Sequence, residues 1–211
     1  MTQTQEKLTP TLFKASIAKS SFTHILFDLD GTLIDSAPGI IAGFSAALLQ
    51  NGVSPICELS EELIGPPLDE TLRIISGISD LVILNKLADS FKEHYDGAGY
   101  KKTLLFEGVN DMLHTLHASG YTLHIATNKR LKPTLLILEY FGWSKIFTST
   151  YALDSAGPRY TNKIEMLSHQ LNEQEISPKT AVYVGDSKGD RIASEKNNLH
   201  FIQADWGYSN I

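Results

Sequence analysis

Short runs of apolar residues recur along the chain, and polar segments with helical spacing separate most of them. Five runs have the length of buried strands, at 25–29, 123–127, 146–151, 181–185 and 201–204. After the second run, strands and helices alternate, which is typical of a parallel sheet whose strands are joined by crossover helices. The pattern therefore predicts an α/β fold built on a parallel sheet.

One connection breaks this alternation. About 90 residues separate the first two predicted strands, and most of them have the spacing of helices. The first of these helices is expected to begin at Asp35 or Ser36, with Pro38 in its first turn. We therefore divide the chain into an N-terminal tail at 1–21, a core at 22–35 and 106–211, and an inserted helical domain at 36–105. The N-terminal segment is expected to be either a mobile tail or a short leading helix.

Composition and charge are those of an ordinary globular protein, since 211 residues with 42% hydrophobic content can bury a sizeable core. The chain has 18 basic and 24 acidic residues and no dense stripe of Lys and Arg, which argues against a nucleic acid polymer as partner. No apolar run approaches the roughly 20 residues that cross a bilayer, so no membrane partner is expected. Cys57 is the only cysteine, which suits a reducing compartment and a cytoplasmic location.

Two acidic side chains follow the first predicted strand, in the segment FDLDGTLIDS. Asp28 and Asp30 lie two positions apart and share a face of an extended chain, at the strand end where open parallel sheets bind ligands. Both carboxylates could therefore reach one cation or one phosphoryl group. A plain strand-end turn at Asp30-Gly31 is the alternative. A calcium loop fails on spacing, because it would need glycine and glutamate where the chain has Leu33 and Gly39.

The segment VYVGDSKGD brings further carboxylates to the same edge of the sheet. Asp186 and Asp190 follow the fourth predicted strand directly. Asp190 has a structural alternative, because Ser187 followed by an acid three residues later resembles a capping box that opens a helix.

Two more segments offer groups that bind anions. Thr127 ends the second predicted strand, and its hydroxyl, together with the backbone N–H of Asn128, could hold a phosphate oxygen. A simple helix cap is the alternative for Thr127. Lys163 lies at a predicted helix start between Asn162 and Glu165, where its ammonium could supply positive charge to a site nearby.

Four features follow one another along the predicted elements: the motif DLDGTL, then Thr127, Lys163 and the motif GDSKGD. In this the chain resembles the haloacid dehalogenase superfamily over about residues 22–208. The helical insertion resembles the small helical cap of that superfamily. The segments IGPPL and WGY make the phosphoglycolate phosphatase-like branch the most similar subgroup. The resemblance implies a Rossmann-like parallel sheet core with an inserted α-helical cap domain.

The resemblance also implies roles for the four acids. Asp28 is the expected nucleophile, which forms an aspartyl-phosphate that water then hydrolyses, and Asp30 is the expected general acid and then base. One Mg²⁺ is expected, held by Asp28, the backbone carbonyl of Asp30 and Asp186. Asp190 would support the residues that bind the metal.

Thr127, Asn128 and Lys163 would then bind the phosphoryl oxygens, while the cap closes over the leaving group. The expected partner is a small phosphorylated metabolite such as phosphoglycolate, a sugar phosphate or a nucleoside monophosphate, and the protein is expected to be a monomer or homodimer. A phosphomutase of the same superfamily and a non-catalytic regulatory module are the alternatives.

The sequence departs from the family pattern at two places. Lys163 lies in PRYTNK instead of the Gly-Lys-Pro-x-Pro surroundings of relatives, which makes Arg159 a rival. The sequence ends at Ile211, where relatives continue through a further helix and strand. The cap is expected to determine which substrate is bound, and Arg73 is one of the polar cap residues that could contact the substrate.

Overall fold

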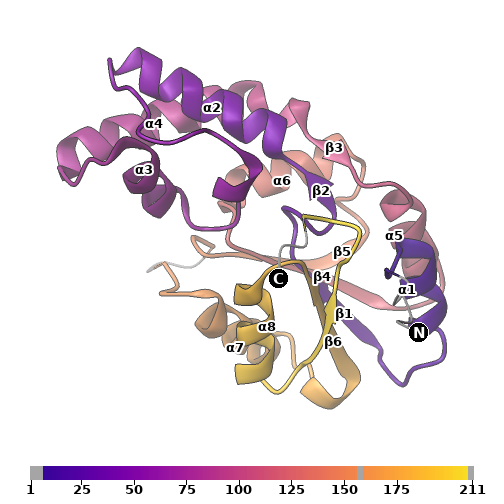
Figure 1. Ribbon diagram of the computed structural model, residues 1–211. Coiled ribbons are helices and arrows are strands. Elements are labelled where there is room, and N and C mark those ends of the chain that lie inside the picture. Colours follow the sequence, from indigo (N-terminus) through magenta and orange to yellow (C-terminus); the bar gives the residue numbers. More distant parts are fainter. Residues whose placement is uncertain (1–6, 156–158, 209–211) are drawn as a thin grey trace, which may run out of the picture.

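A five-stranded sheet forms the centre of the protein in the computed structural model, which describes residues 7–155 and 159–208 (Figure 1). Its order is β5-β4-β1-β6-β7, and every neighbouring pair is parallel. The strands are β1 (His24–Phe27), β4 (Thr122–Thr127), β5 (Phe147–Ala152), β6 (Ala181–Gly185) and β7 (His200–Gln203). All five runs predicted as strands are confirmed, with ends within two residues of the prediction.

Helices cover both faces of this sheet, as a parallel sheet requires. Alternate residues of β1 point to opposite faces, so Ile25 and Phe27 join one hydrophobic cluster and Leu26 joins the other. The first cluster packs under α1 (Pro10–Ile17), α5 (Val109–Ala118) and α6 (Leu131–Tyr140); the second packs under α7 (Lys163–Glu173) and α8 (Lys188–Lys196). The short η3 (Pro178–Thr180) precedes β6.

The N-terminal segment contains a packed helix, which was one of the two forms expected for it. Helix α1 buries Phe13 and Ile17 in the first cluster, and Thr9 caps its start by accepting the N–H of Leu12. Residues 1–6 of that segment, and the chain end at Ile211, lie outside the described residues. Within the described ranges, no helix is both long and apolar enough to cross a membrane.

The long connection after β1 is a separate helical unit. The antiparallel pair β2 (Ile34–Asp35) and β3 (Leu104–Leu105) holds the two linkers together. Between them lie α2 (Ala37–Gln50), η1 (Glu61–Leu63), α3 (Leu68–Ser76), α4 (Leu81–Gly97) and η2 (Gly99–Lys102). These elements form a hydrophobic cluster of their own, around Phe44, Leu87 and Phe91. The fold is therefore an α/β sheet domain with an inserted helical cap, as predicted (Figure 1).

Candidate active site

The loop after β1 places Asp28 and Asp30 at the carboxyl end of the sheet. The N–H of Asp28 donates to the carbonyl of Val184 at 2.9 Å, which continues the ladder between β1 and β6. The chain then turns at Gly31, whose φ of +77° is in the left-handed region. A Cβ at Gly31 would lie 2.4 Å from Oδ2 of Asp186, so the turn needs glycine both for its conformation and for its space.

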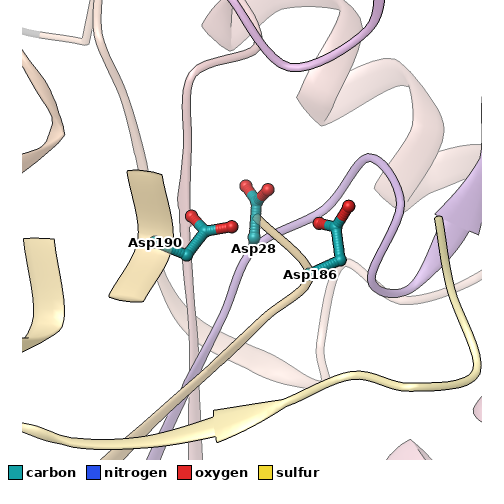
Figure 2. Close-up of side chains that lie close together, drawn as sticks. All are labelled: Asp28, Asp186 and Asp190. Atoms are coloured by element: carbon teal, nitrogen blue, oxygen red, sulfur yellow. The ribbon is translucent and has the colours of Figure 1, made fainter. Parts of the chain in front are cut away.

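Three carboxylates converge beside this loop (Figure 2). One oxygen each of Asp28, Asp186 and Asp190 lies within 4.8 Å of the others, and all three side chains are buried. Burial raises the pKa of Asp28 to about 8, and the attraction of Lys163 offsets this shift only in part. Burial also raises the pKa of Asp186 to about 6, with a further contribution from the charge of Asp190. The cluster therefore concentrates negative charge where water cannot screen it.

Lys163 is the cation of this cluster. Its Nζ lies 3.0 Å from Oδ1 of Asp28 and 2.5 Å from Oδ1 of Asp190, and its side chain is 7% exposed. Burial alone would lower the pKa of Lys163, but the two carboxylates hold it above its usual value. Asn162 caps α7 by accepting the N–H of Glu165, so the predicted helix start is confirmed. The rival Arg159 is exposed, with Nη1 3.4 Å from Asp69.

Asp190 has hydrogen bonds on both of its oxygens. Oδ1 accepts from Lys163 and from the hydroxyl of Tyr183, and Oδ2 accepts from the N–H and the hydroxyl of Ser187. The predicted capping box between Ser187 and Asp190 is confirmed. Although burial opposes it, the charge of Lys163 leaves the pKa of Asp190 below its usual value. Asp190 thus fixes Lys163 in place and has little freedom to bind a metal directly.

Asp28 and Asp186 have the properties of metal ligands. Oδ1 of Asp28 is buried and accepts no aligned hydrogen bond, even though Lys163 lies 3.0 Å away. Asp186 accepts one hydrogen bond on Oδ1, from the hydroxyl of Thr32 at 3.0 Å. Carboxylate oxygens are the ligands that Mg²⁺ prefers, and a divalent cation would favour the ionised form of both carboxylates, whose pKa values are raised first by burial and then by neighbouring acids. The residues present therefore fit such an ion.

Asp30 points away from the carboxylate cluster, towards the cap. Its Oδ1 accepts a hydrogen bond from the hydroxyl of Ser36 at 2.6 Å. Nζ of Lys129 donates to both of its oxygens, at 2.9 and 3.1 Å, and lies 4.7 Å from the centre of the Tyr95 ring in the cap. Asp28 and Asp30 thus have different surroundings although they are two residues apart.

Lys129 is a site residue that the sequence analysis missed. It follows Asn128 directly after β4, and its side chain is only 5% exposed. A lysine two positions beyond a strand end was the available signal. Sequence alone does not show that this side chain turns towards Asp30, because the two residues are 99 positions apart.

Thr127 and Asn128 stand at the end of β4, beside Asp28 and Asp30 in the same cavity. The hydroxyl oxygen of Thr127 accepts the N–H of Lys129 at 3.2 Å, so this side chain also stabilises the turn. The side-chain amide of Asn128 donates to the carbonyl of Gly65 in the cap at 3.0 Å. Asn128 therefore connects the sheet edge to the cap.

A cavity of about 70 Å³ lies between cap and core above these residues. That is room for a few water molecules or a compact ligand, not for a folded polypeptide. Asp28, Asp30, Thr127 and Asn128 form its floor. Arg73, the polar cap residue considered from sequence, is exposed and is not one of the residues that line it.

Cap and core also meet at two other places near the cavity. Both terminal nitrogens of Arg130 contact the carboxylate of Asp96 in α4. At the linkers, the hydroxyl of Tyr208 donates to Asp35 at 2.5 Å and accepts the N–H of Ala37 at 3.0 Å. These contacts hold the cap over the carboxyl edge of the sheet.

The chain is similar to known proteins over most of its length. The family model of the haloacid dehalogenase-like hydrolases matches residues 25–204, and the chain belongs to this family. The crystal structure of a predicted phosphatase from Clostridium acetobutylicum is 26% identical, with a TM-score of 0.79 over 90% of this chain and 88% of that one.

Two curated relatives show how far the similarity extends. The phosphoglycolate phosphatase of Vibrio vulnificus (strain YJ016) is 30% identical over 88% of this chain and 84% of its own. The tyrosine-protein kinase PtkA of Mycobacterium tuberculosis (strain H37Rv) is 31% identical over 92% of this chain. The matched region spans 66% of PtkA's length, slightly less than two thirds. The resemblance expected from the sequence motifs, to a phosphoglycolate phosphatase-like member of this family, is confirmed.

Proposed function

We propose that this protein is a cytoplasmic Mg²⁺-dependent phosphatase that hydrolyses small phosphate monoesters through an aspartyl-phosphate on Asp28. One observation carries the proposal: the Asp28 carboxylate lies at the boundary between the carboxylate cluster with Lys163 and the cavity under the cap. A nucleophile in that position faces the substrate on one side and its activating charges on the other. The family match and the phosphatases among the relatives support the reaction class.

Asp28 and Asp186 would bind Mg²⁺ together with the backbone carbonyl of Asp30, and Asp190 would support the site through Lys163. When bound, the ion masks the negative charges that would otherwise keep a carboxylate from a phosphate dianion. Lys163 adds a fixed positive charge next to Asp28. Oδ1 of Asp28 makes no aligned hydrogen bond in the structure, so this oxygen is available for a ligand or for attack.

The residues on the cap side would divide the remaining tasks. Thr127 and Asn128 line the same cavity as Asp28 and would bind the oxygens of a phosphoryl group on Asp28. Asp30 would give a proton to the leaving group and later accept one from water. Lys129 and Ser36 hold the Asp30 carboxylate in a fixed orientation for this transfer.

The test is release of inorganic phosphate from a panel of small monoesters, with Mg²⁺, after exhaustive EDTA treatment, and after Mg²⁺ is added back. Activity should disappear with EDTA and return with Mg²⁺. Undiminished hydrolysis after EDTA treatment would show that the metal assignment is wrong.

The two aspartates should be separable by substitution. Asp28→Asn should abolish hydrolysis of every substrate, because the nucleophile is lost. Asp30→Asn should retain slow hydrolysis of p-nitrophenyl phosphate, whose leaving group needs little protonation, and lose alkyl phosphates. Equal residual rates of the two variants on p-nitrophenyl phosphate would contradict these roles.

A further inference from the structure

The charges of the cap–core cavity restrict the leaving group that it can accept. Among the described residues that line the cavity, Lys129 and Arg130 are the cationic side chains. A substrate with a second anionic group, such as a carboxylate, would need one of them as its partner. Each of these cations already has a partner within the protein.

Lys129 is engaged on two sides. Its Nζ contacts both oxygens of Asp30, at 2.9 and 3.1 Å, and the ring of Tyr95 lies against it with the centroid 4.7 Å away. Its side chain is 5% exposed, so water does not weaken these contacts. A ligand carboxylate would have to displace Asp30, the residue proposed to transfer the proton.

Arg130 is engaged by the cap. Its Nη1 lies 3.0 Å from one oxygen of Asp96, and its Nη2 contacts the other oxygen in a two-point ion pair. The Asp96 side chain is 7% exposed, so without Arg130 this buried carboxylate would keep only the longer contact with Lys132, whose Nζ lies 3.6 Å away on a side chain that is 72% exposed. The pair holds the cap to the core and leaves the positive charge neutralised.

The cap side of the cavity is apolar. It is formed mainly by Ile40, Phe44, Leu63, Ile64, Leu68 and Phe91. The rings of Phe44 and Phe91 lie 4.7 Å apart, and that of Tyr95 stacks on Phe91 at 5.4 Å. This wall faces a floor that contains the acids Asp28 and Asp30. A carboxylate in the leaving group would lose water against the wall and would find no free cation in the floor, because Asp30 and Lys129 neutralise each other.

We infer that the cavity selects phosphate monoesters whose leaving group is neutral and largely apolar, and that it discriminates against leaving groups with a carboxylate. The inference rests on the proposed function and narrows its substrate class. It would separate this protein from its relatives named phosphoglycolate phosphatase, because glycolate carries a carboxylate next to the scissile ester.

The decisive comparison uses two substrates that differ by one charge. Phosphoglycolate and phosphoglycolamide have almost the same size and the same type of leaving oxygen, but only the first has a carboxylate. With Mg²⁺, kcat/KM should be about tenfold or more higher for the amide, since even a partly hydrated unpaired charge costs that much in binding.

A substitution that supplies a free cation should largely cancel the preference. Ile64 lines the cavity and is half-buried, so Ile64→Lys should raise the ratio of kcat/KM for phosphoglycolate over phosphoglycolamide by about tenfold. Ile74→Lys is the matched control, because Ile74 is exposed on α3 and does not line the cavity. This control should leave the ratio unchanged.

A binding measurement tests the selectivity of the cavity without requiring the protein to hydrolyse the ligand. Phosphonoacetate and phosphonoacetamide are non-hydrolysable counterparts of the two substrates, and calorimetry with Mg²⁺ should find tighter binding of the amide. Equal or better use of phosphoglycolate by the unchanged protein, or equal or tighter binding of phosphonoacetate, would overturn the inference. Tighter binding of the amide without hydrolysis of either ester would overturn the proposed function but support the selectivity. If the protein neither binds nor hydrolyses any member of the set, both are wrong.

Discussion

Replacing Lys163 by methionine tests whether its positive charge offsets the cost of burying the carboxylates of Asp28 and Asp190. The Lys163 ammonium is 7% exposed and lies 3.0 Å from Asp28 and 2.5 Å from Asp190, which is itself 0% exposed. Methionine fills much of the same volume but leaves both acids without their cation. Removing one partner from a buried ion pair costs about 3–5 kcal/mol, because the remaining charge is still desolvated.

This cost gives a definite thermal shift. For a chain of about 200 residues, 1 kcal/mol corresponds to roughly 2–4 °C in the melting temperature. Lys163→Met should therefore lower the melting temperature by about 6–20 °C in EDTA, as measured by circular dichroism. Saturating Mg²⁺ should restore part of this loss, since a bound cation at about 100 times its Kd adds roughly 2.7 kcal/mol to the folded state.

The matched control is Lys14→Met. Lys14 forms an ion pair of similar length with Asp111, at 2.9 Å, but the two side chains are 28% and 76% exposed. Such surface pairs contribute about 0–1 kcal/mol, so this variant should melt within a few degrees of the unchanged protein. If Lys163→Met destabilises the protein no more than Lys14→Met does, Lys163 does not compensate the buried acids.

Two further predictions follow from the turn at Gly31 and from a buried histidine. Gly31→Ala should cost at least about 1–2 kcal/mol for its left-handed backbone, and should also weaken activation by Mg²⁺, because the new Cβ would lie 2.4 Å from Asp186. The control is Gly52→Ala, at a φ of +64° with nothing within 4 Å of its Cβ, which should lose stability but leave the Mg²⁺ dependence unchanged. Burial, followed by the neighbouring charge of His24, lowers the pKa of His124 from 6.5 to about 4. Because the pKa is lower in the folded state, His124 contributes its full stabilisation above about pH 6.5 and loses it as the pH falls towards 4, by up to about 3 kcal/mol. Between pH 7 and pH 4.5, the urea midpoint of the unchanged protein should therefore fall more than that of a His124→Asn variant. Equal falls of the two midpoints would contradict this reasoning.

Local sequence patterns determined most of the architecture of this protein. A strand or a helix cap depends on residues within a few positions of each other, so the apolar runs located all five strands of the sheet and Ser187 with Asp190 located a capping box. The carboxyl ends of parallel strands meet at one edge, and for that reason the order of the strands and motifs was enough to place Asp28, Asp186 and Thr127 together. The length of the first connection was enough to indicate an inserted cap.

Only the tertiary structure decided which charges face each other. Lys129 and Asp30 are 99 residues apart, and Arg130 and Asp96 meet only because the cap packs over the sheet edge. No local pattern encodes such pairs, since they depend on the rotamers of long side chains and on the orientation of two packed units. The burial of α1 against α5 was also decided by the tertiary structure, because α1 packs on a surface that is formed about 100 residues later in the chain. The sequence therefore located the acids of the site, while packing determined which cations neutralise them.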